Sequence, residues 1–209
     1  MLVVKIFTLY PDLFPGPLGT GLYKRAREKK LWDLQIINIR KFSIDSHGTV
    51  DDTPFGGGSG MLMRPDVLAK SLDKNINYKK KEKNIYLSPK GKKFNQAKAK
   101  SLSKENNINI ICGHFEGIDQ RLLETRDIEE ISIGDFILSG GETAAFVVLD
   151  SILRLLPGVL GNEQSKNDES FENGLLEYPQ YTKPQIWEEK SVPEVLLSGD
   201  HSKIKDWRL

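Results

Sequence analysis

The sequence predicts an α/β protein built on a mostly parallel sheet. Short apolar, β-branched segments alternate along the chain with longer segments of helical periodicity, which is the pattern of such sheets. The composition, with 38% hydrophobic and 28% charged residues, is that of an ordinary folded protein and excludes wholesale disorder. A length of 209 residues allows one good core and a smaller appended unit.

The first elements predict a strand–helix–strand unit. Residues 2–9 and 34–40 are apolar and β-branched, as strands are, and residues 18–30 between them have the periodicity of a helix with a basic outer side. A loop rich in Asp, Thr, Pro and Gly is expected over 42–60. The next helix begins near Pro65.

Further strands and helices complete the predicted sheet. The strands are expected at 84–88, 108–112 and 129–133, and helical segments at 94–105 and 117–125. The last strong helix covers 142–156 and is stopped by a Pro-Gly pair. This alternation predicts parallel neighbours in the sheet.

The chain is expected to divide after that helix. Residues 161–177 are polar and aperiodic, which predicts an interdomain linker after a domain over residues 1–160. Residues 178–209 contain too little apolar material to form a core alone.

Charge and targeting signals indicate a cytoplasmic protein. Lys and Arg number 30 against 29 Asp and Glu, so any contact with nucleic-acid phosphates must be local. Basic clusters at 24–30, 79–83 and 90–93 are solvated surface or phosphate contacts. No apolar run approaches the roughly 20 residues that span a bilayer, and no signal-peptide pattern is present. We therefore expect no membrane partner.

Glycine-bearing loops follow the last three predicted strands, at 87–91, 112–117 and 133–142. Open α/β sheets bind ligands beyond the carboxyl ends of their strands. The loops match neither the dinucleotide fingerprint nor the P-loop. Their backbone groups and apolar neighbours would suit an adenosine joined to methionine. The three histidines lack the spacing of metal ligands, so no metal site is predicted.

Blocks across nearly the whole chain resemble one family of RNA-modifying enzymes. The blocks are PFGGGSGM (54–61), YLSPKG (86–91), CGHFEGIDQR (112–121), SIGDFILSGGE (132–142) and YTKP (181–184). Together and in this order they resemble the signatures of the bacterial tRNA (guanine-N1)-methyltransferases. The resemblance implies a SPOUT fold with a C-terminal trefoil knot, and methyl transfer from S-adenosylmethionine to N1 of guanine at position 37 of tRNA.

The resemblance also assigns the glycine loops to the cofactor. The residues it implies for S-adenosylmethionine are Tyr86, Leu87, Ser88, Pro89, Gly91, Gly113, Glu116, Ile133, Gly134, Asp135, Phe136, Ile137, Leu138, Gly140 and Gly141. The target guanine is expected against Gly57, Gly58, Gly60, Met61 and Phe115. Three consecutive glycines, 56–58, permit a close approach of backbone to a planar base.

The chemistry requires a base and a cation. Guanine N1 carries a proton at neutral pH, so a carboxylate must remove it, and a fixed cation stabilises the charge that develops toward O6. By position in the family, Arg154 is the expected cation. The family's aspartate base aligns with Glu169, and its neighbour Asp168 is the rival.

Partners follow from the same resemblance. It implies tRNA as substrate, an obligate homodimer with active sites between subunits, and dependence on magnesium, for which the sequence shows no dedicated ligand cluster. It also implies that residues 178–209 begin a helical tRNA-binding domain that continues further in family members. The alternatives are a related knotted RNA methyltransferase with another target, and a non-catalytic RNA-binding module.

Overall fold

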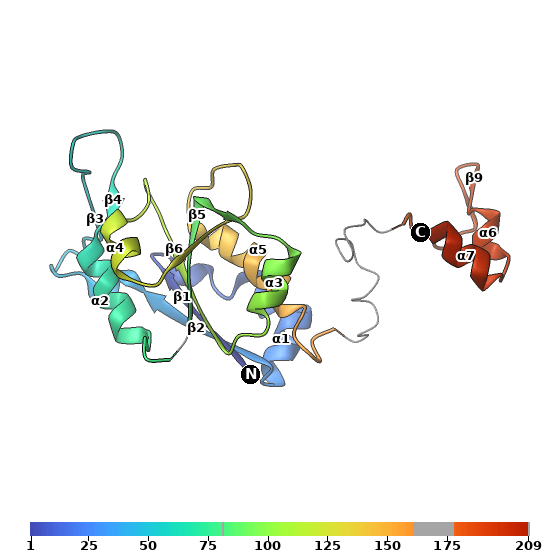
Figure 1. Cartoon of the computed structure of the whole chain (residues 1–209), viewed down its shortest axis with the longest axis horizontal. Helices are drawn as coiled ribbons and strands as arrows, with labels where there is room; N and C mark the ends of the chain where they lie inside the picture. The colour runs from blue at the N-terminus through green and yellow to red at the C-terminus, as the bar shows by residue number, and fades with distance from the viewer. Residues whose placement is uncertain (81, 161–177, 209) are drawn as a thin grey trace. The chain divides into compact units, whose positions relative to one another are not determined.

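The predicted α/β class is confirmed by a computed structural model, which describes residues 1–80, 82–160 and 178–208. The chain divides into two compact units, Met1–Gly161 and Asn162–Leu209. The larger unit contains a five-stranded sheet with the order β2-β1-β6-β5-β7, and every neighbouring pair is parallel (Figure 1). Its strands are β1 (Leu2–Thr8), β2 (Trp32–Asn38), β5 (Lys83–Lys93), β6 (Asn107–Cys112) and β7 (Glu129–Ser132).

The second strand ends earlier than its sequence predicts. Strand β2 stops at Asn38, and residues Ile39–Phe42 form the 3-10 helix η3. The Asn38 side chain accepts a hydrogen bond from the backbone N–H of Arg40, which caps this turn. The β-branched run therefore ends in a helical turn. The Asn38 side chain pairs with the Arg40 N–H, which in a longer strand would need a partner on a neighbouring strand.

The helices of the larger unit are shorter than the periodic segments that predict them. They are α1 (Gly21–Glu28), α2 (Pro65–Asn75), α3 (Gln96–Leu102), α4 (Gln120–Thr125) and α5 (Gly141–Leu153), with 3-10 helices η1 (Pro11–Leu13) and η2 (Gly16–Gly19). The predicted helix over 18–30 is interrupted at Thr20, whose backbone is extended. Asn95 and Asp119 cap α3 and α4 by accepting from the N–H groups of Lys98 and Arg121. These side-chain caps fix the helix starts.

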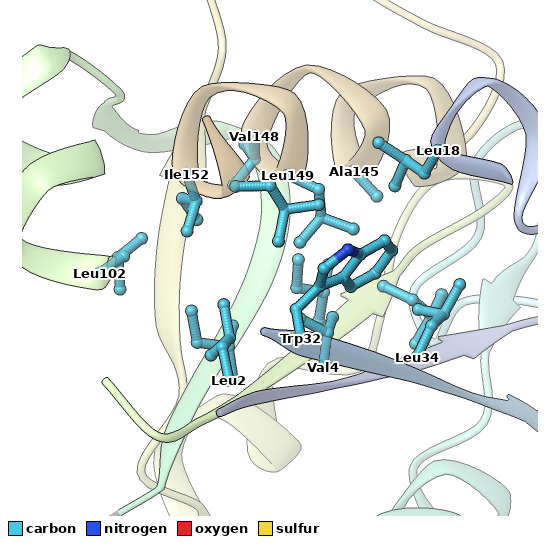
Figure 2. Close-up of a cluster of buried hydrophobic side chains, with 14 of the residues drawn as sticks. Leu2, Val4, Leu18, Trp32, Leu34, Leu102, Ala145, Val148, Leu149 and Ile152 are labelled. Atoms are coloured by element: carbon cyan, nitrogen blue, oxygen red, sulfur yellow. The ribbon is translucent and has the colours of Figure 1, made fainter. Parts of the chain in front are cut away.

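Helices cover both faces of the sheet. On one face α1, α3 and α5 pack on β1, β2 and β6 around the fully buried Trp32 (Figure 2). On the other face α2 and α4 pack on Phe7, Ile111 and Tyr86. The sheet thus forms the middle layer, and its strand ends are left open to form a site.

A conservative change in this core gives the first prediction. Ile152 of α5 is 0% exposed and packs in the cluster of Figure 2. We expect Ile152→Val to lower the free energy of unfolding by about 0.5–1.5 kcal/mol, because one buried methylene is lost. Ile44→Val removes the same group from a side chain that is 64% exposed, and should change it by less than about 0.5 kcal/mol. Urea unfolding measures both, and equal effects would contradict the packing.

A polar row crosses the centre of the sheet beneath α2. Lys5, Asn109 and Asn84 are register partners on adjacent strands. The Asn109 side-chain amide donates to Glu82 Oε2 at 2.9 Å and to Asn84 Oδ1 at 2.8 Å, and the Lys5 ammonium donates to the Asn75 carbonyl at 2.6 Å. These bonds offset the cost of burying polar groups inside the sheet.

The smaller unit is built from short elements. They are β8 (Ile186–Trp187) paired antiparallel with β9 (Lys190–Ser191), then α6 (Glu194–Leu197) and α7 (His201–Arg208). The Trp207 ring lies between Tyr178 and Tyr181, with both centroid distances at 6.2 Å, and the Arg208 guanidinium lies 4.8 Å from the Tyr178 ring centroid. Aromatic contacts therefore replace the apolar core that these residues lack. Across the described ranges, no helix has both the length and the apolar character needed to cross a bilayer.

Candidate functional site

A cavity of about 360 Å³ opens at the carboxyl ends of β6 and β7, beside the irregular middle of β5. Its walls come from three segments that overlap the glycine loops predicted at 87–91, 112–117 and 133–142: residues 86–90 within β5, 113–118 after β6, and 130–141 from β7 to the start of α5. The first of these is not a loop, because β5 continues to Lys93 with a shift in its pairing to β7 between Leu87 and Lys92. The volume falls within the range of small-molecule sites. The location is the one that open parallel sheets use for ligands.

The loops approach one another too closely for side chains at their glycines. A Cβ at Gly141 would lie 2.6 Å from Cys112 Cα, and one at Gly113 would lie 2.7 Å from the Tyr86 ring. The Gly141 N–H donates to the Gly113 carbonyl at 2.9 Å. Glycine at these positions lets three segments from distant parts of the sequence close around one cavity.

Most residues predicted to hold the cofactor line this cavity. They are Tyr86, Leu87, Ser88, Pro89, Gly113, Glu116, Ile133, Gly134, Phe136, Ile137, Leu138, Gly140 and Gly141. The structure brings together side chains from three loops that the sequence places far apart. It adds neighbours that the sequence analysis did not assign, among them Lys90, His114, Glu130, Ser139 and Ala144.

Gly91 and Asp135 do not line the cavity. A Cβ at Gly91 would lie 2.5 Å from the backbone carbon of Glu130, so this glycine permits the close pairing of β5 with β7. Asp135 points to solvent and forms an ion pair with Lys93 at 2.6 Å. Gly91 and Asp135 therefore lie next to residues of the cavity wall without lining the cavity themselves.

The residues predicted to hold the target base lie on a hairpin and on one cavity loop. Strand β3 (Asp51–Asp52), within the segment predicted as a loop, pairs antiparallel with β4 (Leu62–Met63), which follows that segment. The Glu116 N–H donates to the Met61 carbonyl at 2.9 Å, and Gly60 faces the Glu116 side chain. Phe115 lines the cavity. The hairpin is therefore fastened to the rim of the cavity.

Gly57 and Gly58 lie on the exposed part of this hairpin, away from the cavity wall. Both have positive φ, at 79° and 124°, which other residues rarely adopt. Glycine suits the turn at both positions, and their contact with the target base stays a prediction.

Carboxylates and a phenol set the polarity of the cavity. Glu116 is exposed at the rim, and Glu130 lies on β7. Burial, reinforced by the charge of Glu130, raises the pKa of Tyr86 to about 12. The Tyr86 hydroxyl therefore stays neutral, and the cavity combines apolar walls with two carboxylates and the ammonium of Lys90.

A buried row of hydrogen-bonded side chains ends at His114 of the cavity wall. Glu142 is 3% exposed in the first turn of α5, and its carboxylate bonds to Thr8 Oγ1 at 2.5 Å and to His114 Nε2 at 2.7 Å. Sequence reasoning considered His114 only as a metal ligand and assigned Glu142 no role. The available signal was an acidic residue in the first turn of a mostly apolar helix.

Arg154 lies at the opposite end of α5 from the cavity. It is the C-terminal cap of the helix, while Ala144 near the helix start lines the cavity. At 1.5 Å per residue, about 15 Å of helix separates the two. Asp168 and Glu169 lie outside the described residues.

The single cysteine, Cys112, lies next to Gly141 of the cavity wall and can be used to test the packing there. Cys112 is fully buried beneath Gly141, and burial together with the charge of Glu142 raises the pKa of its thiol. We expect an aromatic disulfide reagent to modify the native protein at pH 8 at least about 100-fold more slowly than the urea-unfolded chain, because both access and thiolate are lacking. Spectrophotometric release of the leaving thiol measures the rates. Rapid native labelling would contradict this burial.

Fold and site together define an α/β protein that holds a small ligand between glycine loops at the carboxyl ends of parallel strands. The family model described as tRNA (Guanine-1)-methyltransferase TrmD matches residues 2–209. The chain belongs to this family, and the resemblance seen in the sequence is confirmed.

Named relatives agree with this assignment. The tRNA (guanine-N(1)-)-methyltransferase of Pelagibacter ubique (strain HTCC1062) is 76% identical over 205 residues, covering 98% of this chain and 89% of the relative. The enzymes of the same name from Bartonella quintana (strain Toulouse) and Wolbachia pipientis subsp. Culex pipiens (strain wPip) are each 54% identical, with 98% of this chain covered, and 87% and 89% of the relatives.

Proposed function

We propose that this chain transfers a methyl group from S-adenosylmethionine to N1 of the guanine at position 37 of tRNA, next to the anticodon. Membership of the family supports the reaction and the tRNA substrate. The observation that carries the choice of cofactor is the cavity formed by three glycine loops. Its dimensions and its mixed polar and apolar walls suit a nucleoside joined to an amino acid.

The residues present fit this cofactor. Leu87, Ile133 and Leu138 supply apolar walls for an adenine ring, and the backbone at Gly113 and Gly140 approaches without side chains. Glu116 and Glu130 add the negative charge that a sulfonium group prefers. When bound, S-adenosylmethionine supplies an electrophilic methyl group to the attacking nitrogen.

Two further groups are assigned to the chemistry. A carboxylate at Glu169, or its rival Asp168, accepts the proton from guanine N1, and Arg154 stabilises the charge that develops at O6. Arg154 is separated from the cavity by most of α5. This separation supports a homodimer in which each cavity receives Arg154 from the other subunit.

The remaining parts of the proposal concern architecture and environment. The fold is proposed to include a trefoil knot, supported by the close contacts of Gly91 with β7 and of Gly141 with β6. Residues 178–209 are proposed to belong to a helical tRNA-binding domain, and the protein is proposed to act in the cytoplasm. Within the described residues no three or more His, Cys, Asp or Glu side chains gather as metal ligands, and no step is assigned to magnesium.

Methyl transfer to defined tRNA tests this function. The full chain is incubated with methyl-labelled S-adenosylmethionine and a tRNA transcript carrying guanine at position 37, and the nucleosides are separated after digestion. We expect label in 1-methylguanosine, and none with a transcript in which adenine replaces that guanine. Label on another base or on ribose would favour a related RNA methyltransferase. The absence of both transfer and cofactor binding would favour a non-catalytic RNA-binding module.

A further inference from the structure

One buried carboxylate, Glu142, joins the start of α5 to the end of β1 and to a residue of the cavity wall, His114. Glu142 is the second residue of α5, Thr8 ends β1, and His114 belongs to the loop after β6. Thr8 is 0% exposed and Glu142 is 3% exposed. Polar groups this deeply buried cost stability unless they are paired, and here each is hydrogen-bonded to another of these three residues.

The direction of the hydrogen bonds follows from their partners. Thr8 Oγ1 accepts from the Tyr10 N–H at 2.9 Å, so the hydroxyl proton is free to be donated to Glu142 Oε1. Glu142 lies in the first turn of α5, where the helix dipole favours negative charge. An ionised carboxylate accepts at both oxygens, so His114 donates its Nε2 proton. In the neutral form of the ring, this places the proton on Nε2 and not on Nδ1.

The imidazole in turn fixes the third glycine loop. His114 and Gly140 form a β-bridge, and a Cβ at Gly140 would lie 2.5 Å from His114 Nε2 and 2.8 Å from Glu142 Oε2. The Tyr10 ring closes the other side, with its centroid 4.9 Å from that of His114. His114 and Gly140 both line the cavity. The ring is thus held between the hydrogen bond and the loop that it supports.

From this arrangement we infer that Glu142 is a positioning residue of the cofactor site, acting through His114. Its carboxylate holds the imidazole as the Nε2–H tautomer and keeps the loops at 113–114 and 140–141 in the arrangement that binds S-adenosylmethionine. The inference rests on the proposed function, because it names a further determinant of the same site. Preorganised loops save the ordering cost that a ligand would otherwise meet on binding.

Isosteric substitutions test the positioning. Glu142→Gln keeps the shape but places an amide where one carboxylate oxygen accepts, and Thr8→Val removes the hydroxyl that donates to Glu142. We expect calorimetric titration to show the Kd for S-adenosylmethionine raised about tenfold or more in Glu142→Gln, and a few-fold in Thr8→Val. Glu124→Gln makes the same change at an exposed position on α4 and should leave the Kd unchanged.

The stoichiometry of the titration separates positioning from damage to the fold. A partly unfolded variant would bind with fewer sites per chain at the original Kd, whereas lost positioning weakens the Kd at full stoichiometry. An unchanged Kd in Glu142→Gln, or a loss confined to the number of sites, would overturn the inference and leave the proposed function standing. If the unsubstituted chain failed to bind S-adenosylmethionine, both would fall.

The tautomer provides a readout that needs no cofactor. Nitrogen-15 NMR of the unsubstituted chain should show the His114 proton on Nε2. In Glu142→Gln the amide directed at His114 donates instead of accepting, so the proton should move to Nδ1. A double variant, Glu142→Gln with His114→Ala, should bind no more weakly than the worse single variant, since the two act as one unit. A proton on Nδ1 in the unsubstituted chain, or additive losses, would contradict the chain of contacts.

Discussion

Alanine at position 141 is expected to abolish measurable binding of S-adenosylmethionine. The added Cβ would lie 2.6 Å from Cys112 Cα and 3.0 Å from the Gly113 N, and both are backbone atoms that no rotamer change can move. To accept it, α5 must shift away from the end of β6, and the shift opens the cavity. We expect binding at least about 100-fold weaker, and unfolding free energy lowered by about 1–3 kcal/mol as in other overpacked sites.

Calorimetric titration and urea unfolding measure the two effects, and Gly48→Ala is the control. Gly48 has a φ of 75° but nothing within 4 Å of a Cβ, so its substitution introduces backbone strain without a collision. We expect the control to cost about 1 kcal/mol of stability and to keep its affinity for the cofactor. Normal binding by Gly141→Ala would show that the three loops do not need this close approach.

Local sequence patterns predicted the elements of the sheet because those patterns arise from burial. Strands β1, β5, β6 and β7 begin within a residue of the predicted positions, since their side chains are buried on both faces of a parallel sheet. Helix starts were less predictable. Asn95 and Asp119 act as caps because their own backbones are extended, which depends on how the preceding loop packs.

The candidate site was predictable where a loop carries its own signal and unpredictable where contacts are long-range. The glycine loops were found because glycine in a loop at a strand end is a local feature. The contact of Thr8 with Glu142 joins residues 134 positions apart, and the hairpin of β3 and β4 depends on the loop at Glu116. Gly91 and Asp135 were assigned to the cofactor by resemblance, but their surroundings place them at the β5–β7 pairing and at a surface ion pair.

Removal of the general base should stop methyl transfer while leaving the cofactor bound. Asp168→Asn and Glu169→Gln each replace a carboxylate by an amide of the same shape, which cannot accept the N1 proton. We expect the variant that lacks the true base to lose about 10²- to 10⁴-fold in kcat, and the other less than about tenfold. The Kd for S-adenosylmethionine should stay within about twofold in both, because neither residue belongs to the glycine loops.

Single-turnover methylation of tRNA with cofactor in excess measures the chemical step, and Glu163→Gln controls for a change of charge in the same segment.

Arg154→Ala should also lower kcat without weakening cofactor binding, since Arg154 caps the far end of α5 from the cavity. Mixing Arg154→Ala chains with chains altered at the base then tests the proposed dimer. If each cavity takes both groups from the same chain, every site of a hybrid dimer lacks one of them, whereas a cavity that takes the two groups from different chains leaves one complete site in each hybrid dimer. Full activity in the Asp168→Asn, Glu169→Gln double variant would exclude both carboxylates as the base.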